Sequence, residues 1–192
     1  MELQQVAPGL VRWTVPHPDW EPPEVEDSPA DWPRDVGCVA CEHEHTLVLI
    51  DPLVVDDDYR ALDDLAAAKD DVVVLVTLPF HERSRADVTR RYDGVPDPPE
   101  GVVPFEVEGA GETMYWLPGH RTLVPGDRLL GDRPPGLRLC PPSWMRYLDG
   151  YTQDDLRQAL RPLLQLPVER VLVSHGQPVL EDGHAALERA LA

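Results

Sequence analysis

The order in which strand-like and helix-like segments follow one another limits the folds open to this chain. Two apolar segments, 36–42 and 46–50, flank a tight polar turn at 43–45 and predict a hairpin. The run 72–77 is continuously apolar, which suits a strand covered on both faces. Strands that pair by hairpins, mixed with strands reached through helices, predict mixed sheets flanked by helices.

Helical periodicity and capping signals separate these strands. Ser84 and Thr152 are each followed three residues later by an aspartate, Asp87 and Asp155, which is the spacing of a capping box. Pro167 then ends the second of these helices. Four helices are expected, at 56–68 behind an Asp-rich cap, from 84 onward, at 152–164, and from 182 or 183 to 192.

Short strands and proline-rich loops account for most of the remaining chain. Strands are expected at 102–107, 113–117, 121–124 and 171–174. Pro118-Gly119-His120 is the turn between the second and third of them. Loops are expected at 16–35, 93–101 and 131–143, and the three tryptophans Trp13, Trp20 and Trp32 are expected to cover an edge of the core.

Length, charge and composition narrow the class of protein. A chain of 192 residues favours one domain spanning 1–192, with the Pro/Trp-rich segment 1–35 packed on it. Its net charge of −18, with sixteen arginines and the single lysine Lys69, makes nucleic acid and membranes poor partners. The chain starts without the features of a signal peptide and has no apolar run of bilayer length, so we expect a cytoplasmic protein.

The three cysteines do not form a disulfide framework. Cys38 and Cys41, followed by His43 and His45, have a spacing found in zinc sites. However, side chains three residues apart on a strand point to opposite faces, so both thiols are expected to be buried apolar groups. Cys140 lies beside two prolines and near an arginine; a nucleophilic role is one interpretation, but an inert buried thiol is the favoured one.

Two polar residues stand at the exits of apolar strands. Asp127 follows the strand at 121–124, and His175 follows the strand at 171–174. A carboxylate and an imidazole in such positions are the parts of a metal site at the mouth of a sheet. The alternative interpretation makes Asp127 a turn cap and His175 a partner of neighbouring loops.

These two segments, together with Leu49-Ile50-Asp51-Pro52 at the end of the hairpin, resemble the metallo-β-lactamase superfamily. The resemblance covers nearly the whole chain after residue 36. It implies an α/β (α+β) fold, namely a small αββα sandwich of two mixed sheets flanked by helices. It also implies a site at the sheet edge that holds two metals and is usually hydrolytic.

The chain departs from that superfamily at most of its metal ligands. The family's His-x-His-x-Asp-His motif corresponds to the segment 77–84. An alignment without gaps places Leu78 and Phe80 at the positions of the first two histidines. It places Glu82 at the position of the aspartate and Arg83 at that of the last histidine. Shifting by one residue brings His81 onto a histidine position. Either way three of four ligands are missing, and the family's next histidine-bearing loop corresponds to 108–111, which has no histidine.

Two functional hypotheses follow from this resemblance. The favoured one is an atypical metallo-β-lactamase-fold protein that binds a small molecule or a partner in the remnant cleft, where His81, Glu82 and Arg83 form a polar cluster. The alternative is a metal-dependent hydrolase of esters, thioesters or phosphodiesters. In it, His81, Asp127 and His175, with Glu82 nearby, hold a single zinc or iron ion that activates water, and Arg83 steadies an oxyanion.

Whether the protein is an enzyme, and whether its cofactor is one such ion or none, stays open at this level. Large apolar residues concentrated in 16–35 and 131–150 are expected to shape a pocket for a small-molecule ligand, or a homodimer contact: Trp20, Trp32, Trp144, Met145 and Tyr147. The remaining histidines are expected to be solvated residues without a function: His17, His43, His45 and His184.

Overall fold

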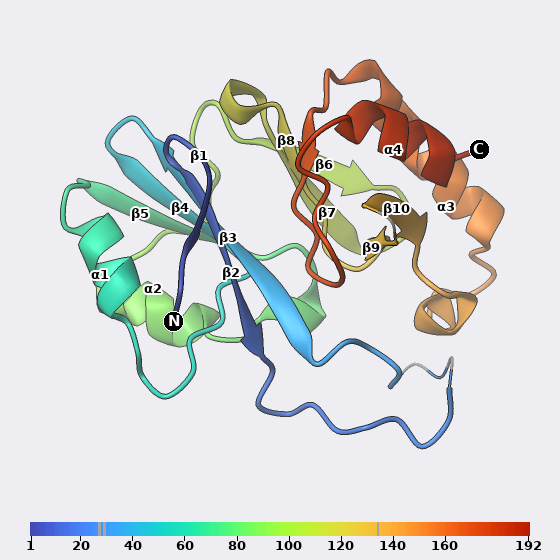
Figure 1. The fold of residues 1–192 in the computed structure, drawn as a ribbon, viewed down its shortest axis with the longest axis horizontal. Coiled ribbons are helices and arrows are strands. Elements are labelled where there is room, and N and C mark those ends of the chain that lie inside the picture. The colour runs from blue at the N-terminus through green and yellow to red at the C-terminus, as the bar shows by residue number, and fades with distance from the viewer. Residues whose placement is uncertain (27, 29, 134) are drawn as a thin grey trace.

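Two sheets lie face to face between two pairs of helices (Figure 1). The structure is a computed structural model that describes residues 1–26, 28, 30–133 and 135–192. Residues 27 and 29 of the loop expected at 16–35, and residue 134 of the loop expected at 131–143, lie outside the described residues.

The first sheet has five strands in the order β1-β2-β3-β4-β5. Their bounds are Gln4–Ala7 for β1, Leu10–Pro16 for β2, Asp35–His43 for β3, Thr46–Ile50 for β4 and Asp71–Leu75 for β5. The first four strands pair antiparallel, and β5 lies parallel to β4 after the crossover through a helix. The hairpin and the buried strand expected from the sequence are therefore confirmed.

The second sheet has four strands in the order β11-β8-β7-β6. Their bounds are Val103–Val107 for β6, Glu112–Leu117 for β7, Thr122–Val124 for β8 and Arg170–Val171 for β11. A separate hairpin is formed by β9, Leu129–Asp132, and β10, Gly136–Leu139. The Pro118–His120 segment makes a 3₁₀ turn between β7 and β8, as its composition predicts.

Each sheet is covered by helices on its outer face. The helices α1, Arg60–Ala66, and α2, Arg85–Tyr92, lie beside the first sheet, whereas α3, Gln153–Leu160, and α4, Gly183–Ala190, lie beside the second (Figure 1). This arrangement confirms the αββα sandwich of mixed sheets. None of the helices in the described part of the chain has the length and apolarity to cross a bilayer.

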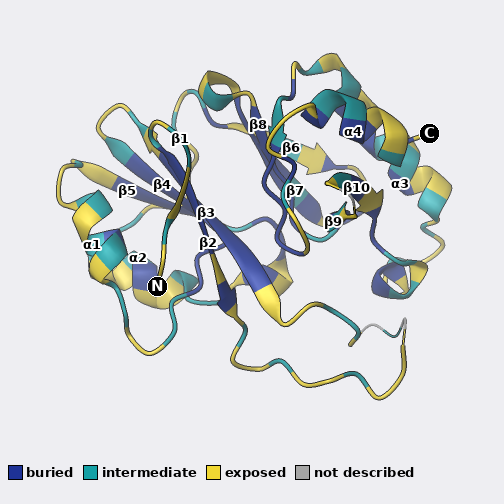
Figure 2. Cartoon of the chain, in the orientation of Figure 1, coloured by how far each residue is buried: buried dark blue, intermediate teal, exposed yellow. Residues whose placement is uncertain are grey.

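Strand periodicity divides the core into layers. On β4, Leu47 and Leu49 pack in one cluster with Leu62 of α1, while Val48 and Ile50 pack between the two sheets. Both sets are buried (Figure 2). Side chains alternate across a strand, so a strand covered on both faces must be apolar throughout, which is why β4 and β5 read as continuous apolar runs.

The two layers of the core separate Cys38 from Cys41. Cys38 packs in the layer between the first sheet and its helices, and Cys41 packs in the layer between the sheets. The two thiols therefore lie on opposite faces of β3 and do not share a site. Cys140 is buried as well, and burial raises the pKa of its thiol to about 11, which disfavours the nucleophilic thiolate.

Several expectations about strands were wrong. The hairpin of β9 and β10 lies largely in the segment 131–143, which the sequence predicts to be a loop, and no strand is predicted for the segments that form β1 and β2. Trp13 does not cover an edge; it is 1% exposed in β2, and its indole N–H donates to Leu53 O at 3.0 Å. The last strand is only Arg170–Val171. Beyond it Leu172 N still donates to Leu123 O of β8 at 2.9 Å, and Ser174 O accepts from Gly37 N of the first sheet at 2.7 Å.

Two helix starts differ from the expected ones. The first helix begins at Arg60 because Asp56 and Asp57 have φ angles of 53° and 52°, which are not helical. Ser84 precedes α2, but its side chain makes no cap hydrogen bond. Instead, Ser84 Oγ accepts from Val54 N at 2.9 Å, so it joins two loops rather than capping the helix.

The capping box of α3 is confirmed. Thr152 Oγ1 accepts from Asp155 N at 3.2 Å, and the Asp155 carboxylate accepts from Thr152 N at 2.8 Å. The α-helix ends at Leu160 rather than at 164, because Pro162 has no N–H to donate, and the chain tightens into a 3₁₀ turn over Arg161–Gln165.

Replacing Thr152 with alanine should lower the free energy of unfolding by about 1 kcal/mol, since one amide at the start of α3 loses its acceptor. Urea titration followed by circular dichroism measures this loss. Serine at position 152 keeps the hydroxyl and should restore most of the stability. Equal losses for the alanine and serine variants would show that the methyl group, and not the cap, matters.

Candidate metal centre

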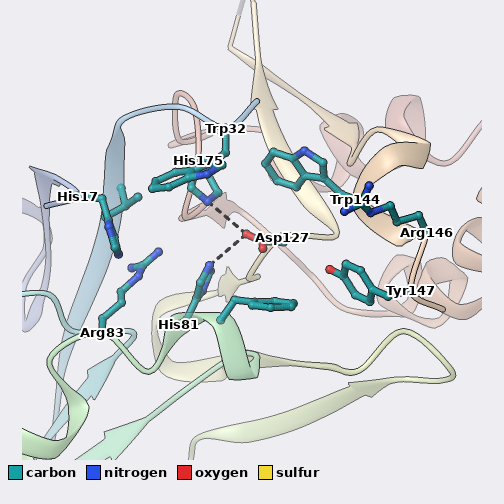
Figure 3. Close-up of a pocket in the computed structure, with 11 residues that line it drawn as sticks. His17, Trp32, His81, Arg83, Asp127, Trp144, Arg146, Tyr147 and His175 are labelled. Atoms are coloured by element: carbon teal, nitrogen blue, oxygen red, sulfur yellow. Dashed lines mark ion pairs between the residues drawn. The ribbon is translucent and has the colours of Figure 1, made fainter. Parts of the chain in front are cut away.

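Three loops bring His81, Asp127 and His175 together at one edge of the sandwich. His81 ends a 3₁₀ turn after β5, Asp127 follows β8, and His175 follows β11. The backbone of His175 is held by Gly131 N, which donates to its carbonyl at 2.9 Å. In Figure 3 both imidazoles point toward the Asp127 carboxylate from different sides.

The geometry of these three side chains suits a cation. Asp127 Oδ1 lies 3.1 Å from His81 Nε2 and 3.3 Å from His175 Nε2. One ligand atom from each residue lies within 4.8 Å of the others. Despite these short distances, Asp127 Oδ1 and His175 Nδ1 are buried without a hydrogen-bond partner among the described residues. Two imidazole nitrogens that face one buried carboxylate oxygen are a donor arrangement that a metal ion can satisfy.

Asp51 and Thr77 fix the orientation of the His81 ring through Nδ1, the ring nitrogen that does not face Asp127. Asp51 Oδ2 lies 2.7 Å from His81 Nδ1, and Thr77 Oγ1 lies 3.0 Å from the same nitrogen. Asp51 is itself held by Thr77, whose backbone N–H donates to Oδ1 at 2.7 Å. A carboxylate that engages one ring nitrogen of a histidine leaves the other nitrogen free to bind a metal.

The charges of the cluster depend strongly on one another. Burial by itself would lower the pKa of His81, but the carboxylates of Asp51 and Asp127 raise it to about 9. Burial opposes ionisation of Asp127, yet His81 and His175 hold the pKa of this carboxyl well below its usual range. Burial lowers the pKa of His175, so its imidazole is neutral and keeps a lone pair.

Glu112 holds the corner that carries Asp127. Its carboxylate accepts from three consecutive backbone amides, those of Gly126 at 3.0 Å, Asp127 at 2.7 Å and Arg128 at 2.9 Å. Burial, with a contribution from the Asp127 charge, raises the pKa of Glu112 to about 7. Gly126 permits this close packing, because a Cβ there would lie 2.6 Å from Thr77 Oγ1.

Arg83 ties together three segments at the same edge. Its Nη1 donates to Gly37 O and to Asp51 O, each at 3.0 Å, and its Nη2 donates to Ser174 Oγ at 2.6 Å. These bonds hold Arg83 at a φ of 38°, which an L-residue rarely adopts. Arg83 also lines the cavity beside the triad (Figure 3), so it can touch a ligand as well as fix the loops.

Glu82 and His120, two other residues that the sequence brings into consideration, lie away from the triad. Glu82 is exposed and pairs with Arg85 at 2.8 Å. His120 lies in the turn between β7 and β8, and neither residue lines the cavity that contains the triad. Of the residues expected at this edge, His81, Arg83, Asp127 and His175 are brought together and Glu82 is not.

A cavity of about 450 Å³ opens above the triad. Its wall is largely aromatic: Trp32 and Trp144 approach the His175 ring edge-on, with centroid distances of 6.0 and 5.7 Å. Phe80 and Tyr147 form a similar pair at 5.5 Å. Trp32, Trp144 and Tyr147 thus come from the two loops expected to shape a pocket.

Sequence reasoning missed three residues of this site. His17 was expected to be solvated, but it lines the cavity and its ring packs against Trp32 at 5.2 Å. The sequence indicates Asp51 only through the resemblance at the end of the hairpin, and no sequence pattern indicates Glu112. Both carboxylates are buried and serve residues far away in the chain, a relation that no local pattern reveals; Leu49-Ile50-Asp51 was the one available signal.

Comparison with solved structures identifies the fold as that of the metallo-β-lactamases. The DIM-1 metallo-β-lactamase superposes with a TM-score of 0.66 at 10% identity, over 99% of this chain and 94% of that one. A metallo-β-lactamase from Erythrobacter litoralis gives 0.61 at 13%, over 98% and 93%. A metallo-β-lactamase family protein from Thermus thermophilus gives 0.52 at 15%, over 96% and 79%. No family model and no curated protein sequence matches the chain. At such identities the likeness establishes the fold alone.

Proposed function

We propose that this chain, which has the metallo-β-lactamase fold, holds one divalent transition-metal ion at His81, Asp127 and His175 and hydrolyses a small organic substrate in the adjoining cavity. One observation carries the proposal: three ligand atoms lie within 4.8 Å of one another at the base of a cavity of about 450 Å³. A cavity of this size suits a small molecule.

The donor set fits zinc or iron(II). Two imidazoles and one carboxylate are found in catalytic zinc sites and in mononuclear iron sites. Asp127 Oδ1 supports this assignment, because it is buried and faces both histidines without a well-formed hydrogen bond to either, so a cation would satisfy it better. When bound, such an ion supplies Lewis acidity and lowers the pKa of a coordinated water.

The chain's own residues orient the triad and shape the substrate pocket. Asp51 directs His81 Nε2 toward Asp127, and Trp32 and Trp144 exclude water from the side of His175. His17 Nδ1 accepts from Asp19 N at 3.2 Å, so the proton of its neutral ring sits on Nε2. The two tryptophans, the His17 N–H and Arg146 on the rim together favour a substrate that is an ester, thioester or phosphodiester with an apolar portion.

A second candidate is a protein that binds its ligand without metal. The arrangement of Asp51, His81 and Asp127 favours it, because a protonated His81 between two carboxylates balances part of their charge without an ion. In that state the aromatic wall and Arg146 would still hold a small molecule.

Metal analysis separates the two candidates. Protein produced with added zinc or iron and purified without chelator is expected to contain about one metal ion per chain, and chelation should remove both the ion and turnover on an ester, thioester and phosphodiester panel. Metal below about a tenth of an equivalent would favour the metal-free candidate. One equivalent without turnover on the panel would retain the metal site and reject the hydrolase.

A further inference from the structure

A second cavity, of about 560 Å³, is lined by Gly37 and Ser174, the sequence neighbours of Val36 and His175, which line the first. Its lining comes from β2, β3, the β9–β10 hairpin and the loop after β11. The charged residues of this lining are Arg12, Arg133, Arg138, Asp35 and Asp132. The two cavities share no lining residue, and no part of the proposed metal centre faces the second one.

Arg12 is the unusual member of this lining. It is only 8% exposed, and within the described part of the chain neither an ion pair nor a hydrogen bond engages its guanidinium. Arg128, which is also buried, is paired by contrast: it donates to Ala110 O from two nitrogens, at 3.1 and 2.8 Å. Arginine is almost never this deeply buried unless it is paired, because desolvation of an uncompensated charge is costly.

The position of Arg12 directs its free donors into the cavity. Leu10 and Arg12 occupy the face of β2 that meets the second sheet, where Leu10 packs in the layer between the sheets. Gly37 leaves room beside the guanidinium, since a Cβ there would lie 3.2 Å from Arg12 Nη2. Burial lowers the pKa of Arg12, but an arginine remains charged at any physiological pH.

The balance of charge around the cavity is positive. Arg133 and Arg138 add two guanidinium groups to that of Arg12, against the carboxylates of Asp35 and Asp132. No carboxylate of the described chain lies within ion-pair distance of any of these three arginines. Guanidinium groups have a planar fork of donors that matches the two oxygens of a carboxylate or phosphate.

We infer that the second cavity binds the oxyanion group of a small molecule, a phosphate or a carboxylate, through the buried fork of Arg12. The cavity is larger than either group alone, so the remainder of the ligand fills it against Arg133 and Arg138. This site is independent of the proposed metal centre and does not rest on the proposed hydrolysis.

Isothermal titration of the full chain with inorganic phosphate, and separately with acetate, tests the inference, with sodium chloride at matched ionic strength as the blank. Saturable binding of one anion per chain is expected below about 10 mM. The stronger of the two arms identifies the oxyanion. Absence of saturable binding in both arms would overturn the inference.

Variants of Arg12 locate the binding. Arg12→Met should weaken it at least tenfold and leave the melting temperature in chloride unchanged or higher, because an uncompensated buried charge is removed. Arg161→Met, at an exposed arginine of the 3₁₀ turn after α3, is the matched control and should bind as the wild type does. Unchanged affinity of Arg12→Met would contradict the proposal.

Two further variants keep the result decisive. If Arg12→Met does not fold, Arg12→Lys retains the charge but not the fork, and it should still bind more weakly than the wild type; wild-type affinity of this variant would overturn the inference. Asp127→Asn should keep the anion affinity. Loss of binding in Asp127→Asn would place the anion at the metal centre instead and reject the second site.

Discussion

Replacement of Asp127 with asparagine is expected to abolish the binding of the one metal ion per chain that the proposed function requires. Asparagine occupies the same volume, but it lacks the charge of the oxygen that lies 3.1 and 3.3 Å from the two histidines. Outer-shell changes already weaken metal sites by about 10- to 100-fold, so loss of a direct ligand should cost at least about 100-fold in affinity. Metal content after dialysis should then fall below about a tenth of an equivalent.

The same substitution should leave the fold intact. The backbone amide of Asp127 donates to Glu112 and does not depend on the side chain. Asp64→Asn, at an exposed position on α1, is a control of equal chemistry and should keep its metal. Mass spectrometry with metal detection, combined with circular dichroism, measures both properties. A folded Asp127→Asn protein that retains one equivalent would exclude this carboxylate as a ligand.

The layers of the fold could be predicted because a strand that is buried on both faces requires a continuous apolar run in the sequence. The apolar runs of β4 and β5 and the capping box at Thr152 are local signals, and each was interpreted correctly. The hairpin of β9 and β10 was not found, because its short strands stand beside prolines that favour a loop. Strand pairing there depends on contacts that a short segment does not encode.

The candidate site was only partly predictable for a related reason. His81, Asp127 and His175 each follow an apolar strand, and the resemblance ordered them along the chain. The residues that position them are separated from their partners by long stretches of sequence: Asp51 lies 30 residues from His81, and Glu112 lies 15 residues from Asp127. Buried charges such as Arg12 and Glu112 look like surface residues in a hydropathy pattern, and only the fold reveals their burial.

Glu112 illustrates how much stability such a hidden residue can control. Its carboxylate is fully buried and accepts three backbone N–H groups from the corner at 126–128. In Glu112→Gln one oxygen becomes an NH₂ group that faces these donors, so at least one buried amide loses its partner. Hydrogen bonds to charged groups contribute about 1.5–3 kcal/mol each, and an unsatisfied buried group costs a similar amount. The free energy of unfolding should therefore fall by about 3 kcal/mol.

Urea unfolding at pH 8, above the pKa of about 7 to which burial raises this carboxyl, measures the loss with the carboxylate ionised in the wild type. Glu106→Gln, on the exposed side of β6, is the matched control and should change stability by less than about 0.5 kcal/mol. Because the corner carries Asp127, metal affinity should weaken in Glu112→Gln although no direct ligand has changed. If Glu112→Gln unfolds like the control while its metal affinity is unchanged, the three amide bonds neither stabilise the corner nor position Asp127.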